Sequence, residues 1–134
     1  MRMLAKNICP ATLIGMALLL AGCNAADETR ERVRRYFEIP AGQKIVAETI
    51  RAAILATVPP GSGTDEVYAY LKRRGIGNDG LSSWYPAEDG RIVCRVDDNP
   101  ETLGLVKQSF GIFFLLDQNG KLKDVEAREW LTGP

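Results

Sequence analysis

The chain has 134 residues, a length that suits one small domain. Hydrophobic residues make up 46% and charged residues 25% of it, which is the composition of a folded protein. The 17 basic and 17 acidic side chains balance, so no net field favours nucleic acid as a partner. Histidine is absent, which excludes Ser-His-Asp and Cys-His nucleophile systems and His-ligated metal sites. Three cysteines are also too few for a Cys₄ zinc cage. From these missing residue types together we expect no enzyme, no metal and no cofactor.

The segment Met1–Gly22 has the features of an export signal. Arg2 and Lys6 form a positive region, and an apolar run follows that is shorter than the roughly 20 residues of a membrane-spanning helix. The run leads into Leu20-Ala21-Gly22-Cys23, which resembles the bacterial lipobox. In that motif the cysteine thiol is diacylglycerylated and the chain is cut before the cysteine. A secretory signal with a coincidental cysteine and an uncleaved membrane helix are the alternatives.

The lipobox resemblance implies that the mature chain is attached to a membrane through lipidated Cys23. In such lipoproteins an Asp after the acylated cysteine retains the protein in the inner membrane, and Asn24 stands at that position here. The resemblance therefore implies the outer membrane, with the protein facing the periplasm. Cys94 is then the remaining thiol, and its alternation with Ile92 and Val96 predicts a buried, unreactive strand residue.

A polar segment, residues 23–40, is interpreted as the lipid anchor and a solvated tether. Val33, Tyr36 and Phe37 are spaced as on one helix face, so a short helix that docks by these side chains is the alternative. The arginines of this segment are candidates for contact with anionic headgroups. The folded domain is expected to follow over residues 41–134.

Two helices are predicted at the start of this domain. The first covers residues 43–57 and is ended by Pro59 and Pro60. Its apolar stripe consists of Ile45, Val46, Ile50, Ala53 and Ile54. The second helix starts at Thr64, which is predicted to be its N-cap, and ends before Gly75, which suits the left-handed C′ position.

The rest of the domain is predicted to be β-structure after a loop over residues 77–90. Strands are expected over residues 91–96, 109–116 and 121–129, the last two joined by a turn at Asp117-Gln118-Asn119-Gly120. A change of apolar parity predicts a β-bulge near Lys123 and Asp124. Trp130 and Leu131 are expected to cap the core.

These elements predict an α+β fold, with two helices packed on one face of a three-stranded antiparallel sheet. The core is expected to be built from the apolar residues that share one face of each element. These are Ile50, Ile54, Val67, Leu71, Ile92, Cys94, Val96, Ile112, Phe114, Leu122 and Val125.

Two segments resemble the SmpA/OmlA (BamE-like) lipoprotein domain. The helix start of that family, Gly-Met-Thr-x-x-x-Val-x-x-x-Leu-Gly, is similar to Gly61-Ser62-Gly63-Thr64-Asp65-Glu66-Val67 with Leu71 and Gly75. Its closing hairpin, Phe-Asp-x-Asn-Gly-x-Leu, is similar to Phe114-Leu115-Leu116-Asp117-Gln118-Asn119-Gly120-Lys121-Leu122. The resemblance implies a fold like that of the β-lactamase inhibitor protein.

The same resemblance implies a non-enzymatic envelope lipoprotein that binds another envelope protein, in outer-membrane assembly or integrity. Because this fold also serves inhibitors, a periplasmic inhibitor or immunity protein that blocks a hydrolase is the alternative. An enzyme ranks third, since the Asp, Glu, Lys, Tyr and Cys side chains show no recognisable catalytic arrangement.

The contact surface for such a partner is predicted around Trp84 and Tyr85. Binding by a domain with a near-zero net charge depends on a few buried anchors, usually Trp, Tyr or Arg. Arg91 and Arg95, on the polar face of the next strand, are expected to complete the patch. Two alternatives stand beside this one. The two aromatic residues could fold back onto the core, or a partner strand could add to the strand near Arg91.

Overall fold

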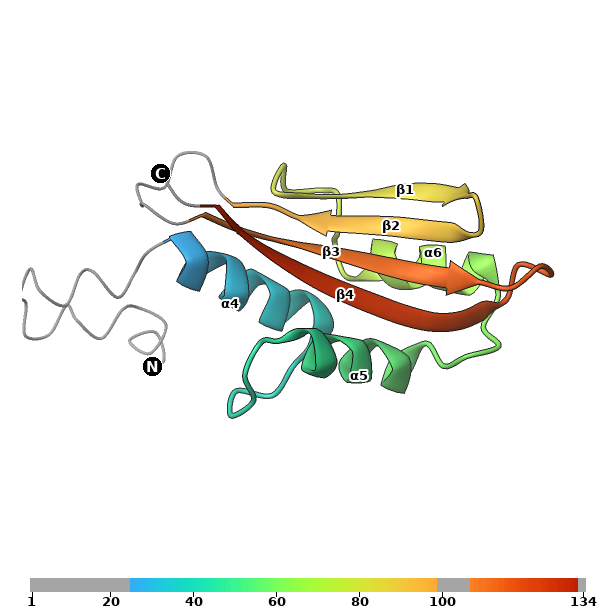
Figure 1. Cartoon of the computed structure of the whole chain (residues 1–134), viewed down its shortest axis with the longest axis horizontal. Helices are drawn as coiled ribbons and strands as arrows, with labels where there is room; N and C mark the ends of the chain where they lie inside the picture. The colour runs from blue at the N-terminus through green and yellow to red at the C-terminus, as the bar shows by residue number, and fades with distance from the viewer. Residues whose placement is uncertain (1–24, 99–106, 133–134) are drawn as a thin grey trace, which may run out of the picture.

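The computed structural model describes residues 25–98 and 107–132, which form an α+β domain (Figure 1). Its elements are α4 (Ala25–Phe37), α5 (Ala47–Thr57), α6 (Thr64–Arg73), β1 (Ser82–Glu88), β2 (Arg91–Val96), β3 (Lys107–Leu116) and β4 (Leu122–Thr132). The α+β class is confirmed, but these ranges hold three helices and four strands where two and three were expected. The predicted signal Met1–Gly22 and Cys23 lie outside the described residues. Within those ranges every helix is too short or too polar to span a bilayer.

The additional helix is α4, in the segment interpreted as a solvated tether. Val33, Tyr36 and Phe37 are buried in the core. The ring of Phe37 stacks on that of Tyr70 with centroids 6.5 Å apart, which joins α4 to α6. The docked helix therefore describes residues 25–37, and the spacer interpretation is wrong for them. The helical spacing of three apolar side chains therefore predicts the structure of this segment better than its charged composition does.

The first predicted helix is shorter than expected, because α5 begins at Ala47. The hydroxyl of Thr49 accepts a hydrogen bond from the Val46 N–H (3.1 Å), which fixes Val46 as the N-cap. Val46 is 41% exposed and is not part of the apolar stripe, whereas Ile50 and Ile54 are fully buried.

The second predicted helix, α6, starts at Thr64, but its N-cap is Gly63. The Gly63 N–H donates to Glu66 Oε1 (2.7 Å), while the Thr64 hydroxyl donates to the Gly120 carbonyl (2.9 Å). Thr64 therefore ties α6 to the β3–β4 turn and does not cap its own helix. At the other end Gly75 has φ +77°, and the Ile76 N–H bonds the Leu71 carbonyl as in a Schellman motif.

The sheet is an antiparallel meander in the order β1-β2-β3-β4. The loop predicted over residues 77–90 is wrong in its second half, because β1 occupies Ser82–Glu88. Ser82–Tyr85 pair in register with Val93–Val96, and the register shifts after Tyr85, where Pro86 removes a backbone donor. Pairing with β2 makes this segment a strand, although its own sequence has no apolar alternation.

The β3–β4 hairpin has the predicted turn and the predicted bulge. The Gly120 N–H donates to the Asp117 carbonyl (3.0 Å) at φ +76°. The backbone N–H groups of Lys121 and Asn119 bond the Asp117 carboxylate and lower its pKa. Leu115 pairs with Asp124 and Leu116 with Leu122, so the residue between those two partners is the extra one.

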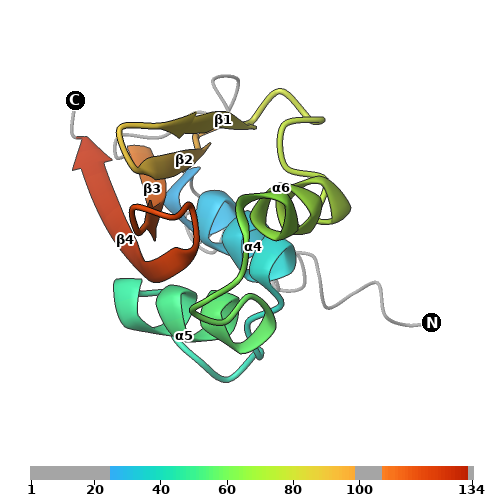
Figure 2. The same cartoon turned by 90° about the vertical axis from the view of Figure 1, so that its right-hand side faces the viewer.

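The core lies between the sheet and the three helices, which cover the same face of the sheet (Figure 2). All the residues predicted for the core are buried, from Ile50 to Val125. The prediction that Trp130 and Leu131 cap the core is wrong, since they are 44% and 59% exposed. Phe110, which was not in the predicted core, is fully buried there.

Candidate binding surface

Among the described residues, the helices lie on one face of the sheet and leave the other face without a helix (Figure 2). The side chains of that other face form the candidate binding surface. In β2 and β3 the buried residues alternate with residues that point to this opposite side. The register sets Tyr85, Val93 and Phe113 side by side across three strands. We call this surface the open face. It consists of Tyr85, Arg91, Val93, Arg95, Ser109, Gly111, Phe113, Arg128 and Trp130.

Phe113 lies at the centre of the open face between two guanidinium groups. The guanidinium carbon of Arg91 is 5.6 Å from the ring centroid, and that of Arg128 is 5.1 Å from it. Arg128 also pairs with Glu126 (3.0 Å). Among the described residues, the guanidinium group of Arg91 has no hydrogen-bond or ion-pair partner, so its N–H donors remain available to an acidic partner.

Trp130 rests on Gly111 at one edge of a shallow depression. A Cβ at Gly111 would lie 2.8 Å from the Cη2 and Cζ3 atoms of the indole, so only glycine lets the ring approach the strand this closely. The depression has a volume of about 510 Å³, and Val93, Arg95 and Phe113 form much of its lining. Arg95 is held at this rim by an ion pair with Asp97 (3.0 Å).

The structure brings together three of the four predicted binding residues and separates the fourth. Tyr85 is 53% exposed on the open face, with Arg91 and Arg95 on the neighbouring strand. Trp84 faces the opposite side, paired with Cys94. Its ring centroid lies 5.1 Å from that of Tyr68, and it packs against the core. The fold-back alternative therefore describes Trp84 and not Tyr85.

The alternative route by strand addition near Arg91 is wrong. That residue lies in β2, which is paired with β1 on one side and with β3 on the other. Among the described strands, the outer edges of the sheet belong to β1 and β4, and the start of β4 is hydrogen-bonded to residues 61 and 62 through the backbone of Leu122 (2.7 Å). β1 carries Pro86, which limits pairing on its outer side, and α5 lies alongside β4, joined to it by the Arg51–Asp124 ion pair (2.9 Å).

Sequence reasoning missed Phe113, Arg128 and Trp130 as members of the open face. Phe113 lies within an apolar run, 110–116, whose alternation is hidden because both faces of the strand carry large side chains. The bulge in β4 also shifts the parity of Arg128 and Trp130 relative to the residues before it. The pairing register of β3 with β4 across the turn at Asp117–Gly120 is the feature that could have predicted their positions.

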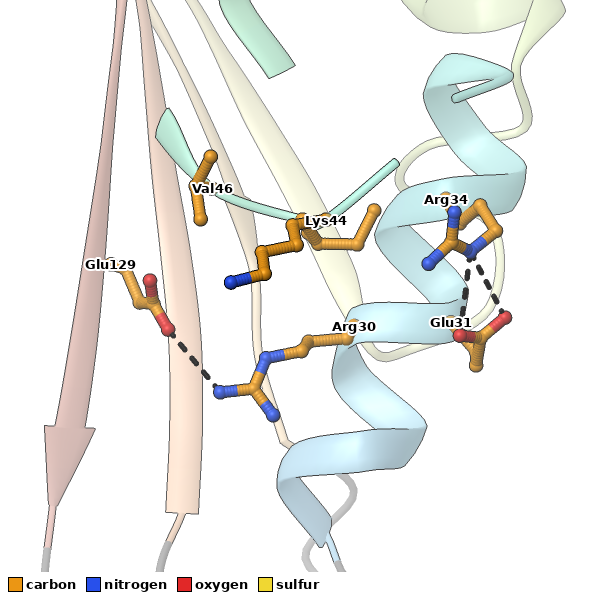
Figure 3. Close-up of a pocket in the computed structure, with 7 residues that line it drawn as sticks. Arg30, Glu31, Arg34, Lys44, Val46 and Glu129 are labelled. Carbon is orange, nitrogen blue, oxygen red and sulfur yellow. Dashed lines mark hydrogen bonds and ion pairs between the residues drawn. The ribbon is translucent and has the colours of Figure 1, made fainter. Parts of the chain in front are cut away.

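A second hollow, of about 460 Å³, lies between α4, the segment before α5 and β4 (Figure 3). Arg30 and Lys44 point toward Glu129, and the Arg30–Glu129 distance is 3.7 Å. Arg34 pairs with Glu31 (3.3 Å) and also donates to backbone carbonyls of the segment before α5. These contacts occupy Arg30 and Arg34, and the residues that line the hollow include no serine, threonine or cysteine. Within the described residues no group of His, Cys, Asp or Glu could hold a metal ion.

The buried ionisable groups belong to the packing of the domain. Burial raises the pKa of the Cys94 thiol to about 12, which keeps it protonated, as expected of an unreactive strand residue.

A hydrogen-bonded cluster joins α4 to the start of β1. Tyr36 donates to Asp79, and Ser82 donates to the same carboxylate (3.0 Å). Burial would raise the pKa of Asp79, but the hydrogen bonds from Tyr36, the Leu81 N–H and Ser82 outweigh it and lower the pKa. This cluster fastens α4 to the start of β1.

Comparison of the chain with models of protein families, with curated proteins and with solved structures found no match. The likeness to the SmpA/OmlA (BamE-like) domain therefore rests on the two segments quoted above and on the lipobox.

Proposed function

We propose that the protein is a non-enzymatic, lipid-anchored outer-membrane lipoprotein that faces the periplasm and binds another envelope protein in outer-membrane assembly or integrity. The observation that supports binding is the open face, where Tyr85, Phe113 and Trp130 lie among three arginines. The motif Leu20-Ala21-Gly22-Cys23 supports the anchor at Cys23.

The composition of the open face is typical of an interface and not of a solvated sheet. Trp, Tyr and Arg are the residues that most often dominate binding energy when a partner buries them. An exposed apolar surface without a partner also favours aggregation, so its presence on a folded domain points to a contact. Arg91 and Arg95 favour a partner that presents carboxylates beside apolar side chains.

The anchor is tested by the intact mass of the protein purified from the membrane fraction. We expect a chain that begins at Cys23 and carries acyl groups. A soluble periplasmic chain without acyl mass would refute the anchor.

The partner is tested by capture from detergent-solubilised membranes, with mass spectrometry of the bound proteins. Arg91→Ala and Tyr85→Ala, on the open face, should lose the partner. Arg73→Ala, an exposed arginine on α6, is the matched control and should keep it. Equal capture by the three variants would refute the open face as the interface. Recovery of one secreted hydrolase and no assembly protein would favour the inhibitor or immunity alternative.

A further inference from the structure

The start of α4 limits how far the domain can stand from a lipid on Cys23. α4 begins at Ala25, two positions after the cysteine. Because an extended chain advances about 3.3–3.6 Å per residue, Cys23 can lie no more than about 7 Å from the Cα of Ala25. An acyl anchor on Cys23 would therefore hold the first turn of α4 at the membrane surface.

Side-chain contacts fix the beginning of α4 to one end of the sheet. The hydroxyl of Thr29 donates to the carboxylate of Asp98, which also accepts the backbone N–H of Gln108. The side-chain amide of Gln108 donates to Glu129, which in turn pairs with Arg30. This chain of contacts runs from α4 through the end of β2 and the start of β3 to β4. Figure 1 shows the start of α4 and the end of β4 at the same end of the molecule.

We propose that this end of the domain, formed by the start of α4 and the end of β4, rests on the surface of a phospholipid bilayer. The inference rests on the proposed function, because it requires an acylated Cys23. It goes beyond that function by assigning a second membrane contact, made by protein side chains, and by orienting the domain.

The exposed side chains at this end suit the interface between lipid and water. Leu131 is the most exposed of the large apolar side chains in the described residues, at 59%, and Trp130 beside it is 44% exposed. Lys107, exposed at the start of β3, pairs with Thr132 at the end of β4. Leucine can enter the acyl boundary, tryptophan suits the headgroup layer, and lysine can reach phosphate. Since the anchor supplies a high local concentration, this contact needs little affinity of its own.

This orientation places the β1–β2 and β3–β4 turns away from the membrane, at the opposite end of the sheet (Figure 1). β3 has 10 residues and spans roughly 30 Å at about 3.3 Å per residue. The open face then stands at the side of the domain, where a partner in the periplasm can reach it. The two surfaces share Trp130 but otherwise consist of different residues, and the label at position 131 lies outside the open face, so the two proposals can fail separately.

Two single-cysteine labelling sites at opposite ends of the sheet test the orientation. Leu131→Cys lies at the proposed membrane end, and Gln118→Cys lies in the exposed β3–β4 turn as its matched control. The native Cys94 is buried, so the unsubstituted protein should take up no label. Each variant is purified with its anchor, labelled with a nitroxide and placed in vesicles of phosphatidylethanolamine and phosphatidylglycerol. Relaxation of the label by oxygen reports lipid exposure, and relaxation by a water-soluble nickel complex reports water exposure.

We expect the label at position 131 to be relaxed more by oxygen and several-fold less by nickel than the label at position 118. Similar nickel accessibility at the two positions, in protein whose mass includes the acyl groups, would overturn the orientation and leave the proposed function standing. A mass without acyl groups would overturn both.

Discussion

Phe113 and Phe114 are neighbours on β3 that face opposite sides of the sheet, so one chemical change can test both sides. Phe114 is fully buried in the core, whereas Phe113 is half-buried on the open face. We expect Phe114→Ala to reduce stability and Phe113→Ala to reduce partner binding. Each variant is the control for the other, because the side chain removed is the same.

The expected losses of unfolding free energy differ in size. Truncation of a buried Phe to Ala costs about 3–5 kcal/mol, through lost burial and the cavity left behind. Phe113 instead gives up its contacts with the guanidinium groups of Arg91 and Arg128, worth about 0.5–1 kcal/mol each at exposed sites. A loss of about 1–2 kcal/mol leaves a domain of ordinary stability folded, since such domains have about 5–15 kcal/mol.

Urea titration followed by far-UV circular dichroism measures these losses, and capture from solubilised membranes measures binding. For Phe113→Ala we expect binding to weaken by about 2 kcal/mol or more, which is roughly thirtyfold, after correction for the folded fraction. Equal losses of unfolding free energy in the two variants would mean that β3 is buried on both faces. Unchanged capture by Phe113→Ala would refute the central role of that ring in binding.

Further predictions concern the core, the two neighbouring aromatic residues of β1 and two ionisable groups. Leu71→Ala should lower the free energy of unfolding by about 2–5 kcal/mol in urea, because Leu71 is fully buried. Tyr85→Ala should reduce capture with little change in melting temperature, whereas Trp84→Ala should lower the melting temperature, with capture following the folded fraction. The Tyr70 hydroxyl is buried without a hydrogen-bond partner among the described residues, and burial raises its pKa to about 12. Tyr70→Phe should therefore be neutral or stabilising at pH 7, and it should lose less stability than the wild type in melts between about pH 10 and 12. The pKa of Asp79 in the folded state is lowered despite its partial burial. Its contribution to the free energy of unfolding is therefore present above about pH 4 and is lost as the pH falls through the folded pKa. Asp79→Asn should flatten this loss of stability in acid melts.

Each of these expectations has a contradicting outcome. A near-neutral Leu71→Ala would place that residue outside the core, and a large loss of stability in Tyr85→Ala would make Tyr85 a packing residue. Destabilisation by Tyr70→Phe at neutral pH would reveal a hydrogen bond to the hydroxyl. An acid decline that is the same with Asp79→Asn would assign the decline to other carboxylates.

The core and most element boundaries could be predicted because they depend on local patterns. Ile50 and Ile54 recur at helical spacing, and Ile92, Cys94 and Val96 alternate as in a half-buried strand. The turn before Lys121 follows from residues that favour a tight reversal. Burial of apolar surface is the largest favourable term in folding. A clear apolar stripe in the sequence therefore predicts which residues of an element are buried in the core.

The elements that were missed depend on contacts between distant residues. β1 contains Ser82, Ser83 and Pro86, which disfavour a strand locally, and it forms because β2 offers a free edge. α4 is strongly charged, and only its three apolar side chains show that it packs. The hydrogen bonds of Tyr36 with Asp79 and Ser82 span more than 40 positions in sequence and leave no local pattern.

The open face shows why the position of a surface residue is harder to predict than that of a core residue. A one-residue change of register moves a side chain to the other face of the sheet, and the bulge in β4 makes such a change before Arg128 and Trp130. Trp84 and Tyr85 are adjacent in sequence, yet one packs beside Tyr68 and the other is 53% exposed. Alternation alone separates them, but which of the two faces the core is decided by pairing with Cys94.

α4 connects the stability of the domain with its proposed attachment. Val33 and Phe37, near its end, are buried in the core, while Thr29 and Arg30, near its beginning, are fastened to the end of the sheet. A flexible tether would let the domain rotate freely above a lipid anchor. In the proposed attachment, a helix that begins two residues after Cys23 and is packed against the domain from Thr29 to Phe37 would instead hold the sheet at a fixed place relative to the anchor. The direction in which the open face points would then be set by the packing of α4, and not by the length of a linker.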